Sequence, residues 1–311
     1  MSKPLRFNVI SQLYPLLVTL CLAVAASLSS CQKELIYKTV VTDQKVEIAF
    51  GDVPYATMST WLFSPPGGQL FYSLPTNRTS TVDAPSSAFN ALCYNDDSDI
   101  NRFEIRSWDE ATVTTGATEL LSRSSFGGTN AEIPRGGDPE EPVLYQPTQL
   151  YADTCSMFTG NNLTFAPKAV LKEIEITVMD IENIQNLSVA SAALSGMSSE
   201  FNLQSLMSQG TACTIPIELS VSKDNKLKGT ALSFGHCSEE ARKHVLTLYF
   251  LLSDGRKIYY SYDVTTQLHT AHDQERIELE VGKIKLPEVA PDGGFDPQLD
   301  SWSTIEEDIA L

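Results

Sequence analysis

The feature that most constrains the fold is an alternation of apolar and polar side chains with a period of two residues. Successive side chains of an extended strand point to opposite faces, so this alternation predicts strands with one buried face. The clearest runs are residues 170–178, 215–221, 246–252, 258–264 and 277–281. The second half of the chain therefore favours β-strands.

Shorter runs of the same kind occupy the first half, and turn residues separate them. The expected strands are residues 46–50, 57–63, 69–74, 88–94, 102–107 and 143–151. The Pro-Pro-Gly-Gly segment at 65–68 joins two of them into a hairpin, because Pro and Gly favour tight turns. Residues 114–142, rich in Thr, Ser, Gly and Pro, are expected to form a long surface loop with one helical turn. A short helix is expected over residues 194–207.

Many short strands separated by turns predict an all-β protein made of antiparallel β-sandwiches. The strands fall into two groups, and each half of the chain is long enough to enclose its own core. We therefore expect two tandem sandwich domains over residues 44–162 and 163–290, followed by an acidic tail over residues 291–311.

The start of the chain has the layout of a secretory signal. Lys3 and Arg6 precede an apolar stretch over residues 13–26, which is shorter than the roughly twenty residues of a membrane-spanning helix. The following LSSC segment, which ends in Cys31, resembles the lipobox of bacterial lipoproteins. This resemblance implies removal of a signal peptide, residues 1–30, while cleavage at another residue is the alternative.

Lipidation at Cys31 would tether the protein to a membrane, since several acyl chains, palmitate among them, anchor a protein stably. A linker over residues 31–43 would follow. Its residues Gln32, Lys33 and Glu34 resemble the short signals that send some Bacteroidota lipoproteins to the cell surface. We therefore expect a lipid-anchored protein of the outer membrane that is displayed on the cell surface.

The net charge excludes one class of partner, and the cysteines offer candidate disulfides. The formal net charge of −17 repels phosphate backbones, so no nucleic-acid partner is expected. Once residues 1–30 are removed, four cysteines remain besides Cys31, and they allow three disulfide pairings in an oxidising compartment. Cys213 with Cys237 is the first choice, because both lie in the same half near expected strand ends, and buried free thiols are the alternative.

Several segments of the second half resemble the fimbrillin-like lipoproteins of Bacteroidota. They are ALSGM (193–197), LSDGRKIYYSYDVTTQL (252–268) and GGFDPQLDSW (293–302), and LCYNDD (92–97) agrees in the first half. The resemblance is to relatives of the fimbrial anchor and accessory subunits, and it implies two transthyretin-like domains behind a lipid-bearing cysteine. It also implies a role in fimbria assembly and adhesion, with other fimbrillin-like subunits as partners and a host or glycan ligand.

Strand exchange between subunits is the mechanism that this resemblance implies. In such β-augmentation, backbone hydrogen bonds supply affinity and side chains that fill pockets supply specificity. The candidate exchanged strand lies in the tail, and its residues are Leu299, Trp302, Ile305, Ile309 and Leu311. The alternative is a tail that folds back onto its own domain.

Catalytic and metal-binding motifs are absent from the sequence, so we expect neither an enzyme nor a metal or other cofactor. His269 and His272 form a loose cluster with Asp273 and Glu275, but a solvated loop explains it better. The competing function is a glycan-binding lipoprotein of an outer-membrane uptake system. It would use exposed aromatic residues such as Trp61, Trp108 or Tyr145 as stacking platforms.

Overall fold

The computed structural model of the 311-residue chain describes residues 40–65, 67–126, 132–237, 242–271, 273–289 and 301–304. Strands dominate these residues, and the helices are the short α2 (Arg123–Phe126), α3 (Thr265–Thr270) and the 3-10 turn η1 (Ile184–Asn186). This confirms the all-β prediction. Within the same residues, no helix is long and apolar enough to cross a membrane.

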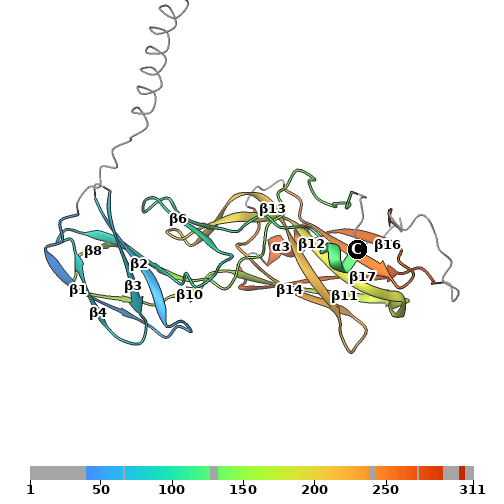
Figure 1. Ribbon diagram of the computed structural model, residues 1–311, viewed down its shortest axis with the longest axis horizontal. Coiled ribbons are helices and arrows are strands. Elements are labelled where there is room, and N and C mark those ends of the chain that lie inside the picture. Colours follow the sequence, from blue (N-terminus) through green and yellow to red (C-terminus); the bar gives the residue numbers. More distant parts are fainter. Residues whose placement is uncertain are drawn as a thin grey trace, which may run out of the picture. The chain divides into compact units, whose positions relative to one another are not determined.

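The first part of the chain forms a sandwich of two sheets (Figure 1). The three-stranded sheet has the order β4 (Ser80–Ala84), β1 (Gln44–Phe50), β9 (Asn162–Phe165). The five-stranded sheet has the order β10 (Lys168–Ala169), β8 (Tyr151–Phe158), β5 (Phe89–Tyr94), β2 (Thr57–Ser64), β3 (Gly68–Pro75). Ile48 from one sheet and Met58 and Phe89 from the other are fully buried in the core between them.

The predicted hairpin at the Pro-Pro-Gly-Gly segment is confirmed. Strands β2 and β3 pair in register up to Ser64 and Gly68. The turn between them closes through a 2.8 Å hydrogen bond from the Gly67 amide to the Ser64 carbonyl. Gly67 has a φ of 109°, which L side chains rarely adopt, so the turn needs glycine there.

The second part of the chain builds one large sheet. Its main order is β17 (Arg276–Lys285), β11 (Lys172–Glu182), β14 (Leu227–Ser233), β13 (Met207–Val221), β12 (Leu187–Asn202), β15 (Val245–Leu252), β16 (Lys257–Asp263), β18 (Trp302–Thr304). The hairpin of β6 (Arg102–Ile105) and β7 (Ala111–Thr114) joins it, because β7 pairs with the end of β12. Most neighbours are antiparallel, whereas β11 with β17, β16 with β18 and β1 with β9 are parallel.

This large sheet turns back on itself and encloses the main core. β14 pairs with β13 only at Ser220 and Val221, and from there it diverges to pair along β11. Side chains from the β11 part, such as Ile176, therefore pack in one cluster with Phe250 of β15 and Tyr260 of β16. Leu268 of α3 is buried in the same cluster.

The helix predicted over residues 194–207 is wrong. Residues 187–202 form the long strand β12, which pairs with β13 on one side and β15 on the other. Ala, Leu and Met are good helix formers, but helix propensity is a weak determinant of structure, and pairing on both sides outweighs it. A bulge between Leu194 and Met197 interrupts the strand, and Gly196 has a φ of 76° there.

The long loop predicted between the fifth and sixth strands does carry one helical turn, α2, but it is not simply exposed. We call residues 115–126 and 132–143 the strap. Leu120, Leu121 and Phe126 of the strap are buried against Ala193 and Tyr249 on the outer face of the second sheet. The strap thus packs on the second sheet, although its residues fall within the predicted 44–162 domain, and both domain boundaries remain predictions.

Candidate functional site on the outer face of the second sheet

The outer face of β12, β15 and β16 is the side turned away from the main core. Inward side chains such as Leu194 and Leu248 belong to that core, whereas Ala193 and Tyr249 point the other way. The strap covers this outer face, and Trp302 joins the same cluster from the tail. The strap and the tail, which lie far apart in the sequence, therefore cover the same face of the sheet.

The edge strand β16 is completed by the chain's own tail. β18 pairs parallel to β16, with Lys257, Ile258 and Tyr259 opposite Trp302, Ser303 and Thr304. The Trp302 ring lies 5.4 Å from the ring of Tyr249 and 6.1 Å from that of Phe126, measured between centroids. Its Nε1 is buried and has no hydrogen-bond partner within the part of the chain that the structure describes.

A buried carboxylate fastens the strap to the sheet. Glu141 accepts hydrogen bonds from the Gly196 amide at 3.0 Å and from the Thr214 hydroxyl at 3.0 Å. Arg242 donates to its other oxygen at 2.9 Å. Arg135, also in the strap, donates to the Thr214 hydroxyl at 2.9 Å and to the Glu141 carbonyl at 2.7 Å. One acidic residue thus joins the strap, β13 and the bulge of β12.

Strand β13 has an edge that β14 leaves open, and the end of the strap pairs with it. Thr214 donates its amide to the Pro142 carbonyl at 2.9 Å and accepts the Leu144 amide at 3.0 Å. Pro216 follows two residues later, so its nitrogen faces the same open side, where a missing N–H costs no bond to β12. The Gln146 side chain donates to the Pro216 carbonyl at 2.7 Å.

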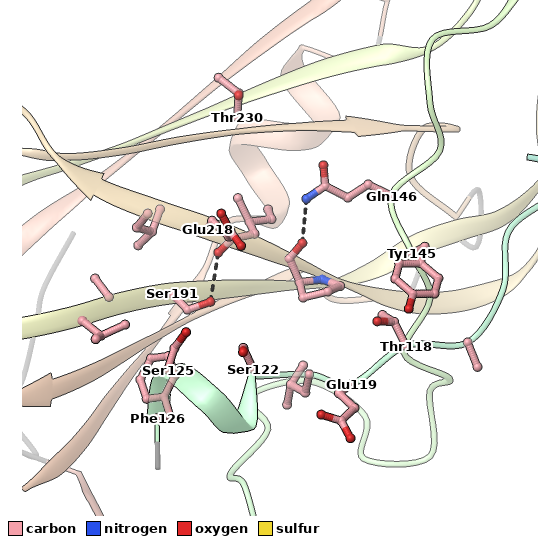
Figure 2. Close-up of a pocket in the computed structure, with 17 residues that line it drawn as sticks. Thr118, Glu119, Ser122, Ser125, Phe126, Tyr145, Gln146, Ser191, Glu218 and Thr230 are labelled. Atoms are coloured by element: carbon pink, nitrogen blue, oxygen red, sulfur yellow. Dashed lines mark hydrogen bonds between the residues drawn. The ribbon is translucent and has the colours of Figure 1, made fainter. Parts of the chain in front are cut away.

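A groove of about 1050 Å³ lies beside this edge. Figure 2 shows some of the residues that line it: Glu119 comes from the strap, Tyr145 and Gln146 from the segment that follows the strap, and Ser191 and Glu218 from β12 and β13. The Ser191 hydroxyl donates to the Ile217 carbonyl at 3.1 Å. Hydroxyl, amide and carboxylate groups therefore share the groove with two aromatic rings, the exposed Tyr145 and the buried Phe126.

Of the residues predicted for lipidation and strand exchange, the structure describes only Trp302. Trp302 lies in β18, against its own second sheet, whereas Cys31, Leu299, Ile305, Ile309 and Leu311 lie outside the described residues. The parallel pairing of Trp302 matches the fold-back alternative for residues 302–304. Exchange of the tail between subunits remains a prediction.

The predicted disulfide is not formed in this structure. Cys213 and Cys237 are buried free thiols, and Cys93 and Cys155 are free as well. Burial, reinforced by the charge of Glu141 and by Cys237, raises the pKa of the Cys213 thiol to about 12. The thiolate that forms disulfides is therefore strongly disfavoured at Cys213.

The aromatic residues considered as glycan platforms differ in their surroundings. Trp61 packs on Phe71 with ring centroids 4.8 Å apart, and Trp108 packs on Phe63 at 5.6 Å. Both are only partly buried, in a cluster that also holds residues of the second sheet. Tyr145 is 49% exposed and lines the groove. Of the three, Tyr145 has the position that a stacking platform needs.

The structure also gathers residues that sequence spacing does not bring together. His236, His244 and His269 have ligand atoms within 4.8 Å of one another. The sequence grouped His269 with His272 instead, and His272 lies outside the described residues. No spacing motif links positions this far apart. Only the pairing of strands places them side by side.

Comparison with known proteins places the chain in a family. Residues 29–218 match the family model described as Domain of unknown function (DUF5119), so the chain belongs to that family. No curated protein matches the chain.

Solved structures share this fold. A Bacteroides ovatus protein provisionally described as an adhesin is 17% identical, with a TM-score of 0.59 over 84% of this chain and 98% of its own. The fimbrial anchor protein Mfa2 from Porphyromonas gingivalis is 8% identical, with a TM-score of 0.47 over 80% and 93%. The likeness to the Bacteroides ovatus protein shows a shared fold, which is consistent with the resemblance found in the sequence.

Proposed function

We propose that this chain is a non-catalytic adhesion protein of the fimbrillin type that serves as an anchoring or accessory subunit of a surface filament. Its lipid anchor would be Cys31, in the outer membrane, and its partners other fimbrillin-like subunits joined by strand augmentation. The fold shared with the Bacteroides ovatus protein and the resemblance of its sequence support this proposal.

The observation that carries the proposal is the short closure of the β16 edge. β16 has seven residues, and β18 pairs with only three of them. An exposed strand edge presents unpaired backbone groups that accept a strand from another chain. A tail that leaves this edge opens it to a partner and becomes available to the partner's sheet.

Attachment of the tail leaves one buried polar group of Trp302 unsatisfied within the described part of the chain, which suits exchange. The buried Trp302 Nε1 lacks a hydrogen-bond partner among the described residues, and an unsatisfied buried donor costs about 1–3 kcal/mol. Ser303 and Thr304 are both exposed. Packing of the Trp302 ring on Tyr249 and Phe126 adds to the short pairing of β18 with β16.

A synthetic peptide of residues 298–311 is expected to bind a chain truncated after Pro297, because the truncation frees the β16 edge. Fluorescence anisotropy of the labelled peptide should show saturable binding to the truncated chain and far weaker binding to the intact chain, whose edge is occupied. A matched peptide with Trp302→Ala should bind at least about tenfold more weakly, because it lacks the indole ring that packs on Tyr249 and Phe126. Equal binding to both chains, or none to the truncated one, would contradict strand exchange at this edge.

Glycan binding is the second candidate, and the groove beside β13 favours it. Tyr145 is half exposed there, next to the polar side chains of Gln146 and Glu218. We expect Tyr145→Ala to abolish any glycan-array signal of the intact chain, because Tyr145 is the exposed ring of the groove, whereas Phe126 is buried. Phe71→Ala is the control, since Phe71 is equally exposed but lies in β3. A signal that survives Tyr145→Ala would exclude the groove as the glycan site.

A further inference from the structure

Three histidine rings meet beside the start of β15, and they come from three separate segments. His236 follows β14, His244 directly precedes β15, and His269 lies in α3. The three ring centroids are 5.0 to 5.3 Å apart. His244 is fully buried, while His236 and His269 are half-buried, so the cluster is reachable from solvent on one side.

Backbone bonds hold each of the three segments in place. The Cys237 amide donates to the Gly196 carbonyl at 3.0 Å, which ties the His236 segment to the bulge of β12. The His244 carbonyl accepts the Val264 amide at 2.9 Å, and the His244 amide donates to the Thr265 hydroxyl at 2.9 Å. The start of α3 is therefore fixed on His244, and His269 is carried to the cluster one turn later.

The nitrogen spacing of two rings fits a shared ion. Nε2 of His244 lies 3.1 Å from Nε2 of His269. A tetrahedral zinc ion with Zn–N distances of about 2.0–2.1 Å holds its ligand nitrogens about 3.3 Å apart. Inserting an ion between these two rings thus requires movements of only a few tenths of an ångström.

The third ring is oriented as a ligand by its neighbour. Nδ1 of His236 lies 3.1 Å from the Cys237 carbonyl, which can only accept a hydrogen bond. Nδ1 must therefore carry the proton, so Nε2 keeps its lone pair. Metal-binding histidines are commonly held in this way, with the non-coordinating nitrogen donating to a carbonyl.

Space for the buried ring is provided by a glycine. A Cβ at Gly196 would lie 2.5 Å from Nδ1 of His244, so no larger residue fits there without displacing the ring.

We propose that His236, His244 and His269 form a binding site for a divalent transition-metal ion, with Zn²⁺ as its best-matched occupant. Imidazole nitrogen is a preferred ligand of zinc, and three histidines leave a fourth position for solvent. The ion would join the end of β14, the start of β15 and α3 in one unit. None of the three histidines lies in β16 or lines the groove, so the proposed metal site is additional to the proposed role in adhesion.

The test is zinc titration of the full chain, purified in detergent with a histidine-free tag and stripped with a chelator. Isothermal titration calorimetry with ZnCl₂ should show one ion per chain. His236→Ala and His269→Ala should each weaken the affinity at least about tenfold, because each removes one of three ligands. Zinc should also raise the melting temperature of the unsubstituted chain and not that of the two variants.

His272→Ala is the matched control, since it removes the histidine that sequence spacing pairs with His269. Its affinity for Zn²⁺ should stay within about twofold of the unsubstituted chain. Far-UV circular dichroism checks that the variants fold, and His269→Gln, which keeps a side chain of similar size, replaces any that does not. Zinc binding that survives loss of both His236 and His269, or no binding by the stripped chain, would overturn the proposal.

Discussion

Replacing Phe250 with alanine is expected to lower the free energy of unfolding by about 3–5 kcal/mol, the usual range for deleting a buried phenylalanine ring. Phe250 is fully buried in the main core, and its ring lies 6.0 Å from that of Tyr260 in an edge-to-face contact. Its strand pairs on both sides, with Ala190 of β12 and Ile258 of β16 opposite it. The surroundings therefore have little freedom to collapse into the cavity.

Urea unfolding followed by intrinsic fluorescence measures this loss as a lower midpoint with an unchanged slope. Phe71→Ala is the matched control, because Phe71 is 48% exposed in β3 and its ring packs on that of Trp61. We expect it to cost less than about 1 kcal/mol. If the two variants lost similar stability, Phe250 would not occupy the centre of the core.

Glu141→Gln is the second substitution with a large expected effect, a loss of about 3 kcal/mol in the free energy of unfolding. The amide keeps the size of the side chain but removes the charge that faces Arg242. It also replaces an oxygen that accepts hydrogen bonds with an –NH₂ group that cannot. The Gly196 amide and the Thr214 hydroxyl donate to the same oxygen and Arg242 to the other, so the amide side chain leaves either the first two donors or Arg242 without its acceptor on this residue.

The neighbouring Glu140→Gln is the control, because Glu140 is exposed and the same charge is removed. It should change stability by no more than about 0.5 kcal/mol. Hydrogen exchange should localise the effect of Glu141→Gln to the strap and the bulge of β12, which this carboxylate joins. Equal midpoints for the two variants would show that Glu141 does not fasten the strap.

The strands that sequence patterns predicted best are those with one buried face. Ile174, Ile176 and Val178 alternate with polar residues in β11, and all three are buried in the main core. The alternation fails for β12, where nearly every side chain from Ala192 to Ser199 is buried. One face of β12 packs on the main core, and its opposite face is covered by the strap. Because both faces are buried, the alternation of apolar and polar side chains disappears. The sequence of residues 194–207 therefore resembles that of a helix.

The candidate sites depended on contacts between distant segments, and sequence spacing missed most of them. Glu141 sits among exposed acidic residues of the strap, and nothing in its local sequence distinguishes it from Glu140. Its burial follows from the bulge at Gly196, 55 positions away along the chain. Tyr145 and Trp302 were named from the sequence, but their surroundings came only from the fold.

The sequence by itself determined the class of fold and the places where strands turn, because alternation and the backbone preferences of Pro and Gly act between near neighbours. Only the tertiary structure decided that the strap covers the second sheet, that residues 302–304 complete the β16 edge and that three histidines share one corner. Each of these depends on long-range pairing, whose register is set by the summed burial of whole strands.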